Sequence, residues 1–242
     1  VVNSSFTNTT AEYGGAIYNT AGSLSVTNSS FTNTTCDISG GAIFSQSSVT
    51  VTDSTFINTK AQNNGGAIYS EYGYVTAIES KFRNCEAQNG SDIYSNSRVT
   101  LMSNDFDGKS TYNSTEVVGN PIINIVPGSL ADVQCRIDNT PENGVLDIPN
   151  KKYTANENDV VITVNKNITI NGHGAIFDAD KRFRIMNIAD GVSIILNNLT
   201  FINGKTSEQG GAICVIGNRS IVIVNNSAFI NTSADDWGGA IG

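Results

Sequence analysis

The sequence predicts an all-β fold, a parallel β-helix in which each coil takes about 25 residues. A repeated phrase, its even spacing and a strand-forming composition predict it. The phrase Gly-Gly-Ala-Ile followed by an aromatic residue begins at Gly14, Gly40 and Gly65, and a Phe-x-Asn phrase follows each copy. Phenylalanines lie 25, 25, 26 and 24 residues apart, at positions 6, 31, 56, 82 and 106. Such regularity indicates one structural unit per repeat.

The composition favours strands over helices. Of the 242 residues, 39% are apolar and only 15% are charged, and Ser, Thr and Asn dominate the polar set. The apolar residues are mainly β-branched and aromatic, which suits pleated strands. A short repeat of such strands cannot bury its apolar face alone, so we expect the coils to stack.

Residues 1–109 contain four to five copies of the repeat. Their predicted strands alternate apolar and polar residues, at positions 24–26, 49–51, 75–78 and 99–102. Paired glycines before a strand allow a left-handed bend and close approach of neighbouring coils. The isoleucines of the phrase should then stack inward. The phrase decays at Gly90-Ser91-Asp92-Ile93, which indicates the end of a first solenoid of C-terminal-type coils.

A junction is predicted over residues 110–127, which hold Pro121 and Pro127. Beyond it, residues 130–137 could form a short amphipathic helix and 144–149 a strand. Further strands are expected at 160–164, 168–170, 175–177, 183–188 and 192–196. The phrases then resume with a step of 28 residues from Phe201 to Phe229. Residues 128–242 therefore read as a cap and the first coils of a second β-helix.

Charge and cysteine content exclude several classes of function. The formal net charge is −8 and no stripe of Lys and Arg with interleaved aromatic residues exists, so nucleic acid is not an expected partner. No apolar run is long enough to insert this segment directly into a membrane. The spacing of the four cysteines fits neither a metal site nor a dense disulfide framework, and we expect free or sparsely paired thiols. Both ends fall inside repeats, so we expect an excerpt from a larger protein.

The repeats resemble those of two groups of surface proteins. Gly-Gly-Ala-Ile with a Phe-led Asn motif is similar to the repeats of chlamydial polymorphic outer-membrane proteins. The chain more closely resembles archaeal adhesin-like surface proteins of methanogens. In those proteins an opening similar to residues 168–178, then one similar to 191–203, leads into Gly-Gly-Ala-Ile coils. The resemblance covers nearly the whole chain. It implies a right-handed parallel β-helix of the pectate-lyase-like type, displayed outside the cell for attachment, and it carries over no catalytic residue.

The asparagines of the Phe-x-Asn phrases are expected to form a structural ladder, with amides turned inward and bonded from coil to coil. They are Asn8, Asn33, Asn58, Asn84, Asn203 and Asn231. Eleven Asn-x-Ser/Thr sequons are present, a density typical of a secreted glycoprotein. Because several sequons coincide with the ladder, Asn113 and Asn218 are the preferred candidates for glycosylation.

The aromatic residues that follow the repeated isoleucine are the sharpest candidates for ligand binding. They are Tyr18, Phe44, Tyr69 and Tyr94, and Cys214 takes the same place in the second solenoid. If the isoleucine points inward, alternation turns the next residue outward, so stacked coils would present a row of rings about 4.8 Å apart. Such a row could stack on sugar rings or anchor a protein. Alternatively, the strand bends and the rings pack under a loop.

Two weaker hypotheses concern catalysis on polysaccharides. The Gly-His-Gly around His173 and the pair Asp235-Asp236 are similar to motifs of polygalacturonases, in which paired carboxylates act on the glycosidic bond. Their order along the chain is reversed here, and a place for His173 in a turn is preferred. A second set could line a lyase-like groove with calcium, or form a solvated edge: Asp178, Asp180, Arg182 and Arg184.

The sequence therefore favours a non-catalytic cell-surface adhesin or surface scaffold. Its partners would be glycans or proteins of a host or neighbouring cell, and no catalytic residue, metal site or cofactor is expected; calcium has no support. Two alternatives stay open: a β-helical polysaccharide lyase or hydrolase, and a stalk, sheath or filament subunit that assembles end to end.

Overall fold

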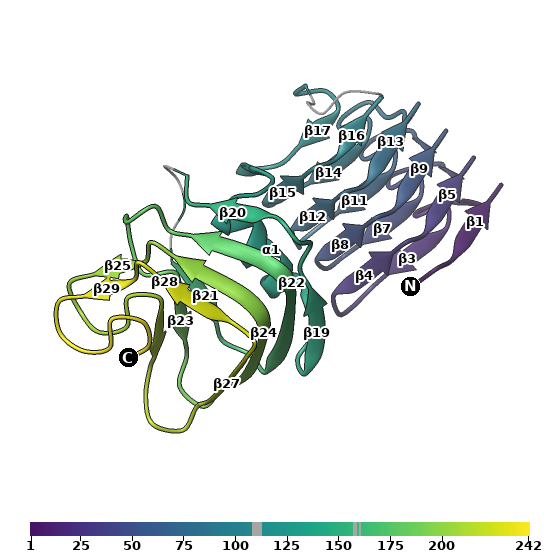
Figure 1. The fold of residues 1–242 in the computed structure, drawn as a ribbon. Helices are drawn as coiled ribbons and strands as arrows, with labels where there is room; N and C mark the ends of the chain where they lie inside the picture. Colours follow the sequence, from purple (N-terminus) through teal and green to yellow (C-terminus); the bar gives the residue numbers. More distant parts are fainter. Residues whose placement is uncertain (108–112, 157–158, 160) are drawn as a thin grey trace. The chain divides into compact units, whose positions relative to one another are not determined.

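The computed structural model describes residues 1–107, 113–156, 159 and 161–242. It divides into two compact units, Val1–Ile125 and Val126–Gly242, and each is a parallel β-solenoid (Figure 1). The predicted β-helix and its period are thereby confirmed. Because the placement of one unit against the other is not determined, each is described by itself.

Among the residues that the structure describes, the first unit has four parallel sheets, and each coil contributes one strand to most of them. One sheet comprises β1 (Ser5–Thr7), β5 (Ser30–Thr32), β9 (Thr55–Ile57), β13 (Lys81–Arg83) and β16 (Asp105–Phe106). A short sheet comprises β2 (Thr10–Ala11), β6 (Thr35–Cys36) and β10 (Lys60–Ala61). The third comprises β3 (Ile17–Asn19), β7 (Ile43–Ser45), β11 (Ile68–Ser70), β14 (Ile93–Ser95) and β17 (Val117–Val118). The fourth comprises β4 (Leu24–Thr27), β8 (Val49–Thr52), β12 (Val75–Ile78), β15 (Val99–Met102) and β18 (Ile122–Ile125).

The register places each residue beside its equivalent in the next coil. Phe6 pairs with Phe31 and Phe31 with Phe56, and the column continues through Phe82 to Phe106. Successive rings of this column are stacked with centroids 4.8, 4.8, 5.0 and 5.2 Å apart. The four rings after Phe6 are fully buried, so the column forms one wall of the core. The constant spacing seen in the sequence is thus the length of chain needed to return to that wall.

The two glycines of the repeated phrase serve different purposes. The first adopts a left-handed conformation, with φ of +56° at Gly14 and +72° at Gly40. The second lies directly beside the next coil: a Cβ on Gly41 would sit 1.9 Å from the carbonyl oxygen of Gly66. The bend and the close approach predicted from the glycine pair are therefore both present.

The first solenoid is longer than predicted. β17 pairs with β14 and β18 pairs with β15, so residues 117–125 add a coil to the first solenoid. The end predicted at residue 109 was therefore wrong, and the first unit reaches Ile125. This coil lacks the repeated phrase, but pairing needs only backbone groups and apolar residues at the column positions, here Val117 and Ile122. Residues 110–112 of the expected junction, and residues 108–109 before it, lie outside the described residues.

The second unit opens with α1 (Leu130–Asn139), close to the predicted helix. Ser129 caps it by accepting a hydrogen bond from the backbone of Asp132, as N-cap serines do. Leu130, Val133 and Ile137 are buried in the core of this unit. Among the described residues, no helix is both long and apolar enough to cross a membrane.

The described part of the second unit has three parallel sheets. The largest comprises β19 (Gly144–Asp147), β20 (Lys152–Thr154), β22 (Ile168–Asp178), β24 (Ser193–Ile202), β27 (Ile221–Asn225) and β28 (Ala228–Ile230). The others comprise β21 (Ile162–Val164), β23 (Met186–Ile188) and β26 (Ile213–Val215), and β25 (Lys205–Thr206) with β29 (Ser233–Ala234). The strands predicted at 168–170 and 175–177 are one strand, β22, with a register shift between Asn171 and Ala175. Residue 160 of the strand predicted at 160–164 lies outside the described residues.

A Gly41→Ala variant should lose at least about 3 kcal/mol of unfolding free energy, because its methyl group would collide with backbone of the next coil. Gly22→Ala is the control: Gly22 has φ of +72° but open space around its Cβ position, so it should lose only about 1 kcal/mol. Denaturant unfolding measures both values. Equal losses would contradict close approach of the next coil as the reason for glycine at position 41.

Candidate functional site

The four candidate aromatic residues do form one row, but its two middle rings are buried. Ring centroids are 5.0 Å apart for Tyr18 and Phe44, 5.1 Å for Phe44 and Tyr69, and 5.6 Å for Tyr69 and Tyr94. Only 4% of Phe44 and 9% of Tyr69 is exposed, whereas Tyr18 in the first coil is 51% exposed. A continuous exposed row is therefore absent from these four positions, and only Tyr18 is largely exposed. The rings pack on one another along paired strands, and not under a loop at a bend as in the alternative.

The physical reason is the coil spacing itself. Rings about 5 Å apart cover each other's faces, so only the edge of a ring inside the row is left for contact with solvent or a ligand. Tyr13 packs edge-on against Phe44, with centroids 5.1 Å apart, and Asn96 donates to the hydroxyl of Tyr69 over 3.3 Å. Burial raises the pKa of that Tyr69 hydroxyl. A sugar ring has no room between such rings, and the row stabilises the first unit.

The asparagine ladder runs along the outside of the first unit. Amide nitrogens donate to the amide oxygen one coil earlier, from Asn33 to Asn8 (3.0 Å), Asn58 to Asn33 (3.0 Å) and Asn84 to Asn58 (3.2 Å). These side chains are exposed, so the expectation that they face inward was wrong. Each asparagine has φ between 50° and 56°, and this left-handed residue ends the strand and turns its side chain outward.

In the second unit the predicted ladder positions behave differently. Asn203 donates to Asp178 over 2.8 Å, and Asn231 has the same left-handed conformation as the other members, with φ of 52°. An amide ladder does occur there at other positions, from Asn225 to Asn197 and from Asn197 to Asn171, at 2.9 and 3.0 Å. The ladder is thus a property of stacked turns.

The two preferred glycosylation candidates are both exposed. The carboxamide oxygen of Asn113 accepts hydrogen bonds from the backbone nitrogens of Thr115 (2.9 Å) and Glu116 (3.1 Å). By contrast, the amide nitrogen of Asn33, another sequon, is engaged in the ladder. Sugar attachment at Asn113 and Asn218 stays a prediction.

The residues proposed for polygalacturonase-like catalysis lie in separate parts of the second unit. His173, in the register shift of β22, contacts Asp147 with 2.9 Å between Nε2 and Oδ1. This hydrogen bond lowers the pKa of Asp147. Asp235 and Asp236 instead follow β29 and bond through their backbones to Thr206 and Glu208. His173 therefore lies inside strand β22, at its register shift, and the expectation that it sits in a turn was wrong. The carboxylate that it contacts is one that the sequence did not suggest.

The residues proposed for a lyase-like groove do not form one site. Asp178 is buried, which raises its pKa, but hydrogen bonds from Lys152 (2.7 Å), Asn203 and the backbone of Asp180 outweigh burial and lower it. Arg184 is also buried, so neither the groove nor the solvated edge describes it. It ties neighbouring coils together by donating to the Gly210 carbonyl, the Asn187 side chain, Glu208 and the Gln209 carbonyl. Within the described residues, no cluster of three or more His, Cys, Asp or Glu side chains could hold a metal ion.

The four cysteines are free and buried, which agrees with the prediction of free thiols. One of them belongs to a polar pair inside the first unit that the sequence did not reveal. The thiol of Cys85 contacts Asp92, a carboxyl that is only 2% exposed and stands where earlier coils have Ala16, Ala42 and Ala67. Burial raises the pKa of Asp92 to about 7, and burial also raises that of the Cys85 thiol.

The exposed aromatic residues of an interior coil lie in a turn that sequence reasoning missed. We call it the aromatic turn, Glu71–Tyr74, between β11 and β12. Tyr72 is 74% exposed and Tyr74 is 41% exposed, and the guanidinium carbon of Arg98 lies 4.9 Å from the centre of the Tyr74 ring. The equivalent turns of neighbouring coils are Gln46-Ser47-Ser48 and Asn96-Ser97-Arg98, so no ring stacks on Tyr72 from above or below.

The aromatic turn is held firmly by its neighbours. The Gly73 carbonyl accepts hydrogen bonds from the hydroxyls of Ser70 and Ser95, both at 2.9 Å. Asn96 donates to the backbone of Glu71 over 2.9 Å, and Gln46 donates to its carboxylate over 3.3 Å. A Cβ at Gly73 would lie 2.2 Å from the backbone nitrogen of Ser48, so only glycine fits there. The two tyrosines are therefore presented by a fixed backbone.

A signal for this site was present in the sequence. The equivalent turns of the neighbouring coils, Gln46-Ser47-Ser48 and Asn96-Ser97-Arg98, hold no aromatic residue, whereas Glu71-Tyr72-Gly73-Tyr74 holds two tyrosines. The departure from the repeat is the signal, since a ring in a turn contributes nothing to the inward columns.

No protein-family profile matches this chain, and neither the curated proteins nor the solved structures contain a match to it. Functional inference therefore rests on the residues themselves.

Replacing Asp92 should stabilise the first unit, and more so at higher pH. Folding raises the pKa of Asp92 from 3.8 to about 7, so folded Asp92 keeps its proton up to a higher pH than unfolded Asp92 does. The unfolding free energy therefore falls as pH rises between these two values. The full loss is on the order of 4 kcal/mol. Asp92→Ala restores the residue of the other coils and should remove this fall.

Unfolding free energies at pH 4, 6 and 8 measure the effect. Asp37→Asn removes an exposed carboxylate from the same unit and is the control. A stability gain for Asp92→Ala that is the same at all three pH values would contradict burial of an ionisable group as the cause.

Proposed function

We propose that the chain is a non-catalytic adhesive or scaffold segment of an extracellular, cell-surface protein. In this proposal the solenoid is a stiff support, and the aromatic turn contacts a glycan on a host or neighbouring cell. The observation that carries the proposal is the exposure of Tyr72 and Tyr74 on a fixed turn of an interior coil.

The chemistry of the turn suits a neutral sugar. Tyrosine rings offer flat apolar faces to the C–H groups of a sugar ring and a hydroxyl at the edge. Gln46, Glu71 and Asn96 surround the turn with amide and carboxylate groups, which bond sugar hydroxyls. Because the backbone is already ordered, binding loses little conformational entropy.

The expected affinity of one turn is low. Two rings provide little contact area, so useful attachment would require many copies of the protein on one surface. The resemblance to adhesin-like repeat proteins points to the same mode of action. Display outside the cell also agrees with the abundance of sequons.

A Tyr72→Ala/Tyr74→Ala variant should bind its glycan about tenfold more weakly, because both stacking faces are lost. The measurement is binding of the intact chain, immobilised at high density, to a panel of neutral oligosaccharides. Tyr18→Ala is the matched control, since it removes a half-exposed tyrosine of the same unit from outside the turn. Its binding should equal that of the unaltered chain.

Two results would overturn the proposal. One is unchanged binding in the double variant while its unfolding midpoint is also unchanged. The other is release of reducing or unsaturated sugar ends in proportion to protein, which would make the chain a polysaccharide-cleaving enzyme.

A further inference from the structure

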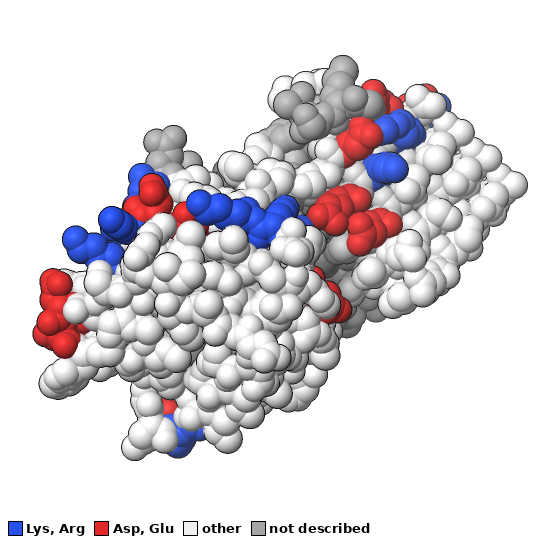
Figure 2. Space-filling view, in the orientation of Figure 1, with Lys and Arg blue, Asp and Glu red and all other residues white. Residues whose placement is uncertain are grey.

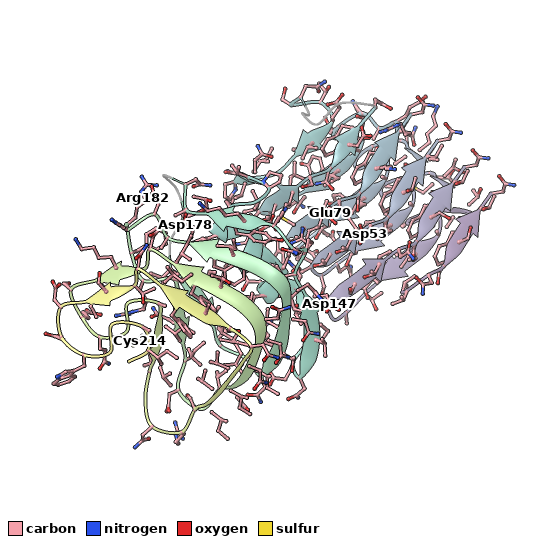
Figure 3. The ribbon with its side chains drawn as sticks, in the orientation of Figure 1. Asp53, Glu79, Asp147, Asp178, Arg182 and Cys214 are labelled. Carbon is pink, nitrogen blue, oxygen red and sulfur yellow. The ribbon has the colours of Figure 1, made fainter. Side chains whose placement is uncertain are left out.

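One sequon asparagine of the second unit stands outside the amide ladder. Asn197 belongs to the ladder, since it donates to Asn171 and accepts from Asn225, and the ladder ends at Asp147 of β19, which Figure 3 labels. Asn198 follows directly in β24 and has φ of 53°. Its side chain is exposed and has no hydrogen bond among the described residues. The amide of Asn198 is therefore available to another group.

The preceding coil leaves the Asn198 amide uncovered. The register shift of β22 places three residues, 172–174, opposite Asn198 alone. Two of them are glycines. His173 between them contacts the Asp147 carboxylate over 2.9 Å, on the side of β22 that faces away from β24. The one side chain of this segment is thus held away from Asn198, which agrees with the exposure of that asparagine.

Asn198 also begins an Asn-x-Thr sequon, which continues through Leu199 to Thr200. Such a sequence is the acceptor for N-linked sugar. Ladder sequons are less suited, as Asn33 shows: its amide nitrogen donates to one neighbouring coil and its amide oxygen accepts from the other. A sugar on Asn33 would displace stacked side chains about 4.8 Å away on both sides. At Asn198 no such contact is lost.

An apolar stripe lies on the outward face of the same sheet. Val145, Thr169, Ile195 and Ile223 are aligned across β19, β22, β24 and β27, and we call them the outer stripe. Val145 is 61% exposed and Ile223 is 43% exposed. Figure 2 shows almost no charged side chain over the middle of this face. A contiguous exposed apolar row of this kind marks a surface that another group covers.

Asn198 lies within reach of the outer stripe. Ile195 precedes Asn198 in β24 by three residues, which corresponds to about 10 Å along a strand, and Ile223 is one coil further on. A short oligosaccharide attached at Asn198 spans that distance. The C–H faces of its sugar rings can pack on the apolar side chains while its hydroxyl groups stay in water. The stripe is then covered without a second protein.

We propose that Asn198 carries an N-linked oligosaccharide that lies over the outer stripe. The co-reactant is a lipid-linked oligosaccharide. The amide nitrogen of Asn198 forms the bond to the anomeric carbon and loses a proton, while the bond from that carbon to the lipid phosphate breaks and the phosphate leaves with the electron pair. Because Leu199 is only 1% exposed, the transfer precedes the folding of β24. The proposal rests on the extracellular location in the proposed function and is independent of the aromatic turn.

Mass spectrometry of the protein purified from the cells that make it tests the attachment. Trypsin releases residues 185–205, in which Asn198 begins the only sequon. This peptide should carry the mass of an oligosaccharide at Asn198 in the unaltered chain and in Thr200→Ser, which keeps the sequon hydroxyl. The variants Asn198→Gln and Thr200→Val should lose that mass.

Two outcomes of this measurement would overturn the proposal. One is an unmodified peptide from the unaltered chain, and the other is sugar retained in Thr200→Val. Neither outcome changes the glycan binding expected of the aromatic turn, which lies in the other unit.

Binding of an apolar dye tests whether the sugar covers the outer stripe. Asn198→Gln should bind at least about twofold more dye than the glycosylated chain at an unchanged unfolding midpoint, because the stripe is bare. Adding Val145→Thr and Ile223→Thr to that variant should remove the increase. Asn113→Gln, which removes a sequon of the first unit, is the control and should leave dye binding unchanged. Equal dye binding by the glycosylated chain and Asn198→Gln, or an equal rise in Asn113→Gln, would contradict the cover.

Discussion

Parallel, in-register hydrogen bonding between successive coils is the constraint on which both units depend. It places each residue on its own equivalent about 4.8 Å away, so a side chain must be compatible with a copy of itself. Phenylalanine satisfies this by stacking its rings, and asparagine by joining one amide to the next. Glycine satisfies it by leaving room for the neighbouring backbone at Gly41. The repeated phrase therefore consists of residues that can stack on their own equivalents in the next coil.

The same rule limits where a ligand can bind. A residue that recurs in each coil packs its side chain against its own equivalents, as the rings of Phe44 and Tyr69 do. Binding surfaces should then arise where the repeat is broken. The aromatic turn is such a departure, and so is the buried Asp92. In a protein of this kind, irregular residues carry more functional information than regular ones.

The sequence predicted the fold well and the candidate site poorly, for one physical reason. Period, strand positions and α1 depend on local patterns of apolar residues, which the sequence shows directly. The exposure of Tyr69, Asn33 and Arg184 depends on what the adjacent coils place against them. Alternation along a strand of three residues could not show that stacked rings cover each other. The left-handed conformation that turns Asn33 outward belongs to the turn, not to the strand pattern.

A solenoid also separates folding from recognition. Turns such as Glu71–Tyr74 lie outside the inward columns, so their side chains can change while the phenylalanine wall and the glycine contacts stay intact. Because side-chain hydrogen bonds to its backbone hold the aromatic turn, the proposed contacts there would not include the cost of ordering a loop. In the proposed adhesive function, stiffness would be the main contribution of the β-helix, more than the chemistry of any one contact.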